Sequence, residues 1–429
     1  MPVSNHTIQA ITARTTARFG SRQGRPMLGL GCILVGLFCL VPAMAQEEGW
    51  GYVPPRDPAN DYLNAIDGIE AEYGPYATEL SDLYVGLGQT LLDRGDYEQA
   101  RDAFQRGVMV VRVNSGPNSP EQSNGLYLIA NIEAILGDMD TAGEVLHTIY
   151  SINSKYYGEE SPELLPVLDR IYQWYLVTRP PGSEMLDYLD YERTMELTEK
   201  MAHISEAVKG MGHPDTSLAY RRLGEAHFQT MRYMMSQEMF SAVSSGYLVT
   251  REGIEQSTRD QFRAGHRAFQ KYLESLLAEE SSSPLEYAEA LADLADWLLV
   301  FGKSGLAWDR YEEAYQVLAN SEDYADLADS HMAQPKPVYF FDLTPGYLED
   351  APAELQEMSL DISMTVTNSG GVRYVEVLNA PEDISENDLG NIKRRVRGII
   401  FRPAVKEGEV VTTEEFIWQY AIVPQGLTS

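Results

Sequence analysis

A block of 42 residues recurs along this chain of 429 residues, and it limits the possible folds more than any other feature. Its clearest marker is a glycine, which stands at positions 74, 116 and 158. A second pair of glycines, at positions 95 and 137, keeps the same period. Periods of about 20 to 50 residues are typical of repeat proteins, in which each unit buries its apolar surface only against its neighbours. The sequence therefore predicts a stack of similar units.

Within the blocks, apolar residues follow a helical spacing. In the first block a turn at Gly95-Asp96 separates two such stretches, so each block predicts two helices joined by a short turn. Small or aromatic residues recur where paired helices must touch, and we expect them to pack between helices. These residues are Gly88, Ala100, Phe104, Ala130, Ala142, Gly224, Phe240, Ala295, Ala307 and Tyr311.

The spacing of Gly88, Ala100 and Phe104 resembles that of the tetratricopeptide repeat (TPR), in which small residues let two antiparallel helices touch. The period exceeds the roughly 34 residues of the standard repeat and is similar to the longer repeats of the kinesin light chain type. The resemblance implies a TPR-type helical solenoid over residues 58–320, with about five helical hairpins and a groove that binds proteins or peptides.

The third and fourth hairpins are the least regular. The fourth is predicted around Leu223-Gly224, with Tyr233 and Phe240 after the turn and a preceding turn at Gly212-His213-Pro214. Residues 251–268 have two interpretations, a helix packed in the stack or an irregular excursion.

The first 45 residues have the features of a secretory signal. They contain four arginines after position 10 and no acidic residue, followed by an apolar run over 27–42 and a small-x-small site that predicts cleavage after Ala45. Both cysteines, Cys32 and Cys39, lie here, so a cleaved chain would have no disulfide. We expect export to the periplasm by the general secretory route. The alternative is an anchor in the inner membrane, because residues 27–45 approach the roughly 20 residues that span a bilayer.

The balance of charge bears on the partners. The chain has 64 acidic and 33 basic residues, a formal net charge of −31. Such a surface repels nucleic acids and anionic lipids, so we expect no nucleic acid partner, and a membrane contact only if the N-terminal segment is retained. The excess of acidic residues is typical of proteins that stay soluble in a salt-adapted organism. The alternative is a docking face for basic partners.

The pattern changes after residue 320. Residues 321–357 contain four prolines and break the helical periodicity, so they are predicted to form a linker. Alternation of apolar and polar residues then predicts strands up to Val366 and over 372–378, separated by a glycine turn. A short helix over 385–397 and a strand over 412–423 follow. The expected fold class is therefore mostly α, with a small closing α+β domain of β-β-α-β order.

Residues 358–424 resemble the C-terminal domain of the TonB family. The matching residues lie in the hairpin turn, in a Phe-Arg-Pro-Ala run and in the last turn: Gly370, Gly371, Phe401, Arg402, Pro403, Ala404 and Gly408. The resemblance implies strand addition, in which an exposed sheet edge pairs with an extended peptide. The candidate edge residues are Phe416, Trp418, Gln419 and Tyr420. From the residues alone we expect Phe401 to fix the helix to the sheet and Pro403 to stop the helix.

No motif for chemistry is present in the sequence. We find no His-Glu-x-x-His pattern, no Gly-x-Ser-x-Gly elbow and no phosphate or dinucleotide loop. The pairs Glu159-Glu160 and Glu279-Glu280 are interpreted as solvated surface, and His213 as a turn residue. We predict no catalytic, cofactor-binding or metal-binding residue.

The sequence as a whole favours a non-enzymatic scaffold that binds protein or peptide partners in the periplasm or at the outer membrane of a Gram-negative cell. Two alternatives stay open. One is an anchored energy transducer of the TonB type for outer-membrane transport, and the other is an accessory subunit of an envelope enzyme complex.

Overall fold

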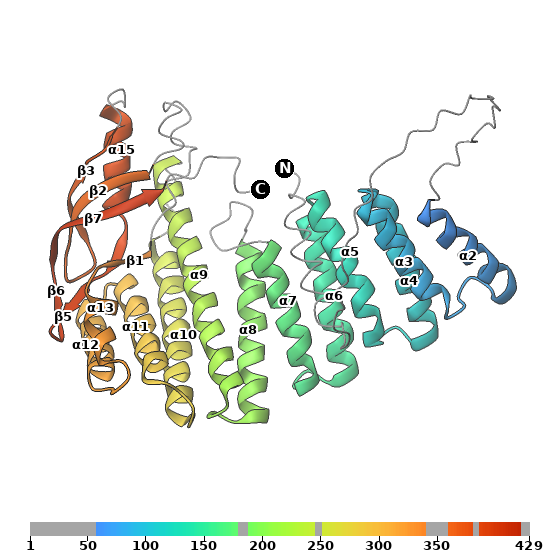
Figure 1. Cartoon of the computed structure of the whole chain (residues 1–429), viewed down its shortest axis with the longest axis horizontal. Coiled ribbons are helices and arrows are strands. Elements are labelled where there is room, and N and C mark those ends of the chain that lie inside the picture. The colour runs from blue at the N-terminus through green and yellow to red at the C-terminus, as the bar shows by residue number, and fades with distance from the viewer. Residues whose placement is uncertain (1–56, 179–187, 245–250, 340–358, 381–385, 422–429) are drawn as a thin grey trace, which may run out of the picture. The chain divides into compact units, whose positions relative to one another are not determined.

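The computed structural model describes residues 57–178, 188–244, 251–339, 359–380 and 386–421 (Figure 1). Antiparallel helix pairs of the TPR type are followed by a small antiparallel sheet with one helix, so the expected mostly α class with a closing α+β part is confirmed. The chain divides into two compact units, residues 1–152 and 153–429. The expected signal segment over 1–45 lies outside the described residues. None of the helices that the structure describes is both long and apolar enough to cross a membrane.

The helices of the first unit are short and end at glycines. They are α2 (Pro58–Tyr73), α3 (Leu80–Asp93), α4 (Tyr97–Ser115), the 3-10 turn η1 (Pro120–Gln122), α5 (Ser123–Leu136) and α6 (Met139–Tyr157). Gly74 and Gly116 follow α2 and α4 with φ of 90° and 94°, and their N–H groups donate to the carbonyls of Glu70 and Arg112. A side chain is unfavourable at such a φ. The 42-residue glycine series therefore marks the helix ends.

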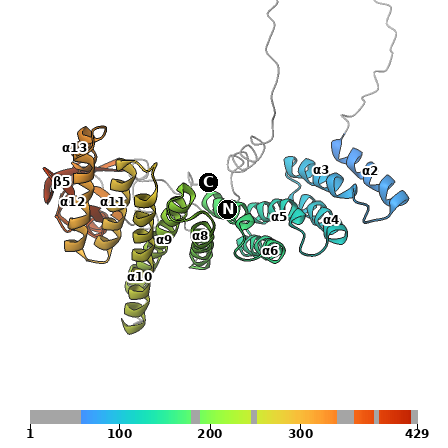
Figure 2. The same ribbon diagram turned by 90° about the horizontal axis from the view of Figure 1, so that it is seen from below.

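The second unit contains the two longest helices that the structure describes, α9 and α10 (Figure 2). They are η2 (Pro162–Leu164), α7 (Leu165–Thr178), α8 (Tyr188–Lys209), α9 (Pro214–Ser244), α10 (Arg251–Ala278), α11 (Pro284–Val300), α12 (Ser304–Ala319) and α13 (Ala325–Met332). The glycine with positive φ after α8 is Gly210, at 82°, and not Gly212.

The predicted fourth hairpin is wrong. Helix α9 continues without a break through Tyr233 and Phe240, where a turn and a second helix were expected. Residues 225–243 contain neither glycine nor proline, so nothing in this stretch stops a helix. The second helix of the pair is α10, which packs against α9 and includes the segment that the sequence left open.

Aromatic side chains fill the space between α9, α10 and α11. Trp297 is fully buried, and its indole Nε1 donates to the carbonyl of Phe262 at 3.2 Å. The rings of Phe269 and Phe301 lie 5.8 and 4.8 Å from the ring of Trp297, measured between centroids. A β-carbon at Gly265 would approach the same indole to 2.2 Å, so this position allows only a glycine at the observed spacing.

The closing part contains more strands than expected. Its elements are β1 (Lys336–Tyr339), β2 (Ser359–Val366), β3 (Val372–Val377), α15 (Glu386–Val396), β4 (Ile400–Arg402), β5 (Ala404–Lys406), β6 (Glu409–Val411) and β7 (Thr413–Ala421). Strands β3, β2 and β7 form one antiparallel sheet in that order, β1 pairs with β4, and β5 pairs with β6. Helix α13 and strand β1 both lie within the segment for which a linker was expected.

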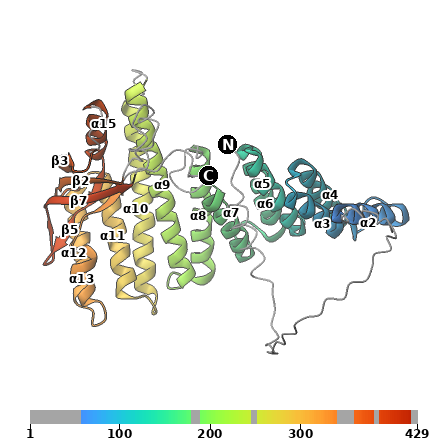
Figure 3. The ribbon, with the colours of Figure 1, turned by 45° about the horizontal axis from the view of Figure 1, so that its top comes forward.

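One side of the three-stranded sheet is covered by α15, which packs beside β3 (Figure 3). Leu360, Ile362, Met364 and Val366 alternate along β2 and are fully buried or nearly so. They share a core with Phe401 and with two residues of α15, Ile392 and Val396. The alternation that predicted β2 therefore directs its apolar side chains to the helix side.

Candidate protein-interaction site

The residues expected to pack between helices are inaccessible in the structure. Ala100, Phe104, Ala130, Ala142, Ala295, Ala307 and Tyr311 have no exposed surface. A β-carbon at Gly88 would lie 2.5 Å from the ring of Phe104. A β-carbon at Gly224 would lie 2.8 Å from the ring of Phe269 of α10. The side chain of Phe240 lies outside the described residues. Those of these residues whose side chains the structure describes therefore hold helices together and are not available to a partner.

A repeated tyrosine–glutamate hydrogen bond went unnoticed in the sequence. The hydroxyl of Tyr84 donates to Glu70 at 2.7 Å, and the hydroxyl of Tyr220 donates to Glu206 in the same way. Each glutamate precedes its tyrosine by 14 residues and stands four before a capping glycine. Burial and the hydrogen bond with Glu206 raise the pKa of Tyr220. The shared spacing of 14 residues between glutamate and tyrosine could have predicted this contact between successive helices.

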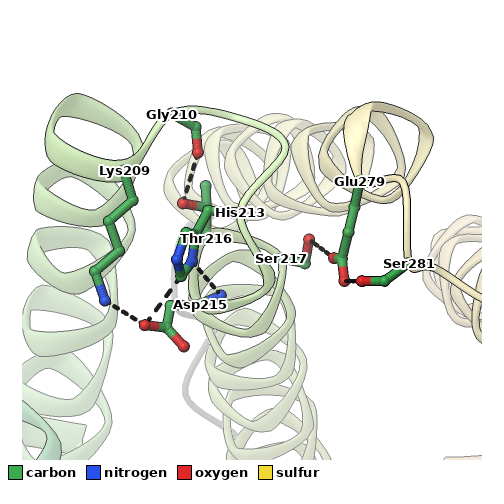
Figure 4. Close-up of polar contacts among 8 residues, drawn as sticks. All are labelled: Lys209, Gly210, His213, Asp215, Thr216, Ser217, Glu279 and Ser281. Carbon is green, nitrogen blue, oxygen red and sulfur yellow. Dashed lines mark hydrogen bonds and ion pairs between the residues drawn. The ribbon is translucent and has the colours of Figure 1, made fainter.

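The turn between α8 and α9 is held by local polar contacts (Figure 4). Lys209 at the end of α8 forms an ion pair with Asp215 in the first turn of α9. The ring Nδ1 of His213 accepts from the backbone N–H of Asp215 at 3.1 Å. His213 thus satisfies a free N–H at the start of a helix. It occupies the predicted turn.

A second set of contacts joins this turn to the end of α10 (Figure 4). The Oγ of Ser217 donates to Glu279 at 2.8 Å, and the Oγ of Ser281 donates to the same carboxylate at 2.8 Å. Glu279 is half-buried, whereas Glu280 is exposed. The interpretation of Glu279 as solvated surface was wrong, because its carboxylate ties α9 to α10.

An arginine of the closing part reaches a buried carboxylate on α11. The Nε and Nη2 of Arg402 donate to the two oxygens of Asp296 at 2.9 and 2.6 Å. The side chains are 16% and 12% exposed, so this bidentate pair is largely removed from water. The hydroxyl of Tyr311 donates to Asp296 at 2.6 Å, and Asp293 lies 3.6 Å from Arg402. We call these four residues the latch.

The charges of the latch depend on one another. Burial alone would lower the pKa of Arg402, but the charge and hydrogen bonds of Asp296 raise it well above its ordinary value. Burial and the neighbouring Asp296 also raise the pKa of Tyr311. Burial and the negative charge of Asp296 raise the pKa of Asp293, although its side chain is 39% exposed and water moderates the effect. Arg402 therefore stays charged and Tyr311 stays a donor.

The hairpin between β2 and β3 is held by the same helices. The indole Nε1 of Trp308 in α12 donates to the carbonyl of Asn368 at 2.7 Å. Gly370 has a φ of 78°, and a β-carbon there would lie 2.6 Å from the carbonyl of Phe401 and 2.8 Å from Leu299 of α11. Glycine at this position permits the turn and also the close approach to α11.

The other residues of the TonB-like motif are placed as follows. The carbonyl of Gly371 accepts from the N–H of Thr367 at 2.9 Å within the hairpin, and Phe401 and Ala404 are fully buried. Gly408, with φ of 85°, closes the hairpin between β5 and β6. Pro403 does not stop the helix, because α15 ends at Val396 and Pro403 separates β4 from β5.

Strand β7 forms one edge of the sheet, and most of its aromatic side chains face the core. The rings of Phe416 and Trp418 lie 6.0 and 5.5 Å from the ring of Phe401, and Tyr420 is buried. Of the four candidate edge residues only Gln419 is exposed. Ile417, which the sequence analysis did not select, is 57% exposed. The outward side chains of this edge are therefore Ile417 and Gln419.

The backbone of β7 can be oriented from its neighbour β2. Asp361 of β2 donates its N–H to Asn379 and accepts from the N–H of Leu378, so both its polar backbone groups point toward β3. Along a strand, the backbone N–H and C=O groups of successive residues point to alternate sides. The groups of Ile362 therefore point toward β7, where its partner is Trp418. The N–H and C=O groups of Ile417 and Gln419 therefore point away from β2. Within the described residues β7 pairs only with β2.

The free part of this edge is short. Met364 pairs with Phe416 and Val366 pairs with Thr413, so two residues of β7 stand opposite one of β2. This is a β-bulge, and Glu415 within it has a φ of 50°. Bulges bend an edge and interrupt further pairing. Pairing with another strand is thus limited to residues 416–421.

Comparison with known proteins gives the general setting. No protein-family model and no curated protein matches the sequence. Among solved structures, BtubC (BKLC) from P. vanneervenii is similar over 61% of this chain and 88% of its own, at 13% identity and a TM-score of 0.32. A Podosopora anserina protein described as a kinesin light chain with nearly identical TPR-like repeats is similar over 57% of this chain and 98% of its own, at 14% identity and a TM-score of 0.36. A variant of that protein covers the same shares, at 13% identity and a TM-score of 0.35. Likenesses this low say nothing about what the chain binds.

Proposed function

We propose that this chain is an exported, non-enzymatic scaffold that binds proteins, with the TPR-type repeats holding one partner and the edge strand β7 pairing with an extended segment of another. The observation that carries the proposal is the orientation of Ile417 and Gln419, whose backbone N–H and C=O groups point away from β2. An edge of this kind binds a peptide by adding a strand, in which main-chain hydrogen bonds supply the affinity.

The latch supports the same proposal because it fixes the closing part to the helices. An edge strand can receive a peptide only if its own sheet stays in place while the peptide pairs. The bidentate contact of Arg402 with Asp296 and the bond from Trp308 to Asn368 fix the closing part to α11 and α12. The sheet is therefore presented on a rigid support, and little order has to be gained when a segment binds.

The chemistry expected of the added segment follows from the outward side chains. Ile417 offers an apolar surface, and Glu414 and Glu415 stand exposed at the bulge. A segment with an apolar residue opposite Ile417 and a basic residue nearer the bulge fits this edge best. Peptides of that pattern are therefore the proposed ligand class.

The pairing is tested by replacing Gln419 with proline. Proline removes the outward N–H without taking a hydrogen bond from the β2–β7 ladder, a position where edge strands tolerate it. A photoreactive amino acid at Ile417 should crosslink a partner in cells, and Gln419→Pro should abolish the crosslink with the far-UV circular dichroism and melting temperature unchanged. Gln419→Ala keeps the N–H and should crosslink normally. Equal crosslinking by a folded Gln419→Pro protein would refute strand pairing.

Export is tested separately by mass spectrometry of the mature protein from its native host. A chain that begins at Gln46 supports export with cleavage and argues against the anchored energy transducer. A chain that retains residues 27–45 and fractionates with the inner membrane supports the transducer instead.

A further inference from the structure

The last turn of α15 carries an unusual concentration of positive charge for this chain. Lys393, Arg394, Arg395 and Arg397 are four cations within five positions, in a protein that has 64 acidic and only 33 basic residues. The backbone N–H of Arg397 donates to the carbonyl of Lys393 at 3.2 Å, so Arg397 continues the helical path beyond Val396. All four cations are therefore placed by one rigid element.

Two of these cations are directed away from the sheet, and a third lies beside them. Ile392 and Val396 are buried in the core, which fixes the inward side of α15. At about 100° per residue, Arg394 and Arg397 fall on the other side of the helix, and Lys393 lies on the flank between the two sides. Arg394 and Arg397 are exposed and Lys393 is half-buried. We call the face formed by these three residues the basic face.

The basic face lacks compensating charge. Within the part of the chain that the structure describes, none of its three cations forms an ion pair, and Arg394 donates only to the neutral side chain of Asn391 at 3.0 Å. The helix dipole favours cations in a last turn. Lys393 and Arg397 stand four residues apart, however, and like charges at this spacing repel one another, so an anion that lies against them would stabilise the helix.

A glycine on the same side of the helix gives a second, independent indication. Gly390 lies one turn before Arg394 in the interior of α15, where glycine costs about 1 kcal/mol relative to alanine. A β-carbon built at Gly390 would meet nothing within 4 Å, so no contact inside the described structure requires a glycine there. A bare backbone beside cations allows another chain to come close to the helix.

We propose that the basic face of α15, with Gly390, binds an acidic polypeptide segment of a partner protein. The basic face covers little more than one turn of helix, which matches a few carboxylates on a single segment. A flat anionic membrane is a poorer match, because it would also approach the exposed glutamates Glu386 and Glu376 of this part and the strongly acidic remainder of the chain. The proposal does not depend on strand pairing at β7.

The test uses the full chain and a labelled hexaglutamate peptide, with hexaglutamine as the uncharged counterpart. Fluorescence anisotropy at low salt should show binding of hexaglutamate only, weakening as salt rises. The triple variant Lys393→Ala, Arg394→Ala, Arg397→Ala should lose affinity by at least about tenfold. The control variant Lys155→Ala, Arg263→Ala, Lys303→Ala makes the same change in net charge at dispersed exposed sites and should bind as the wild type does.

A further variant tests whether the missing side chain at Gly390 contributes to binding independently of the three cations. Gly390→Gln adds a helix-favouring side chain, so it should melt at the same or a higher temperature and still lose affinity for hexaglutamate. Unchanged affinity in Gly390→Gln would overturn the close approach to the helix. Absence of hexaglutamate binding, an equal loss in the control variant, or stronger binding to phosphatidylglycerol vesicles than to the peptide would each overturn the proposal. Gln419→Pro should leave hexaglutamate binding intact, which keeps this result distinct from that of strand pairing.

Discussion

Replacing Arg402 with methionine should destabilise the second unit. Methionine fills a similar volume but leaves the carboxylate of Asp296, only 12% exposed, without its bidentate partner. Removal of one partner from a buried pair costs about 3–5 kcal/mol. The hydrogen bond from Tyr311 remains and offsets about 1 kcal/mol of that loss. We therefore expect the free energy of unfolding to fall by about 2–4 kcal/mol.

The assay is equilibrium unfolding in urea at pH 7, followed by tryptophan fluorescence. Trp308 reports directly on the closing part, since its indole donates to the hairpin at Asn368. Arg310→Met provides a matched control, because Arg310 forms an ion pair with Glu313 of the same helix and 40% of its side chain is exposed. Such an exposed pair contributes little, so the control should unfold close to the wild type.

A double-mutant cycle shows whether the loss comes from the pair itself. Asp296→Asn keeps an acceptor for Tyr311 while removing the charge that Arg402 faces. If the pair is coupled as its geometry indicates, the double variant Arg402→Met, Asp296→Asn should be more stable than the sum of the two single losses by about 2 kcal/mol. A loss below about 1 kcal/mol for Arg402→Met, or additive losses within about 0.5 kcal/mol, would refute the reasoning.

Two further predictions concern stability. The raised pKa of Asp293 means that the folded state holds a proton that the unfolded state has released, so stability should decrease as pH rises above about 4 and through the folded pKa. Asp293→Asn should flatten that slope in a series of melting temperatures and be the more stable protein at neutral pH, and a slope that persists in the variant contradicts the assignment. Gly88→Ala places a β-carbon against Phe104 and should cost about 1–3 kcal/mol, whereas Gly68→Ala on α2 meets nothing and should raise the melting temperature slightly. Equal effects of the two alanines in thermal unfolding would contradict the packing argument.

The repeats were predictable from sequence where the signal is local. Gly74, Gly116 and Gly158 each adopt a positive φ after a helix, and this requirement depends on the backbone of a few neighbouring residues. The pairing of Gly88 with Phe104 is similarly local, because it joins two adjacent helices through a short turn. In α9, where no glycine or proline ends the helix, the repeat pattern wrongly predicted a turn inside a continuous helix.

In the closing part, β2, β3, α15 and β7 were predictable in their order, whereas the short strands β1, β4, β5 and β6 and the attachment to the helices were not. Alternation identified β2, and the positive-φ glycines identified its hairpin. The partner of Arg402 stands 106 residues away on a helix, and no spacing rule connects the two positions. The Phe-Arg-Pro-Ala run therefore predicted the packing role of Phe401 correctly. The role of Arg402 could not be predicted, because it depends on the three-dimensional position of Asp296.

The bulge at Glu415 limits the number of hydrogen bonds that an added strand can form with β7, and so limits its affinity. Within residues 416–421, the backbone groups of Ile417, Gln419 and Ala421 point outward, so the edge offers three N–H and three C=O groups. At a net contribution of about 1 kcal/mol each, six such bonds correspond to a dissociation constant between about micromolar and millimolar. A segment held this weakly exchanges rapidly unless a second contact on the same partner raises its local concentration. If the proposed pairing at β7 takes place, a lasting complex therefore requires that the same partner also contacts another part of the chain.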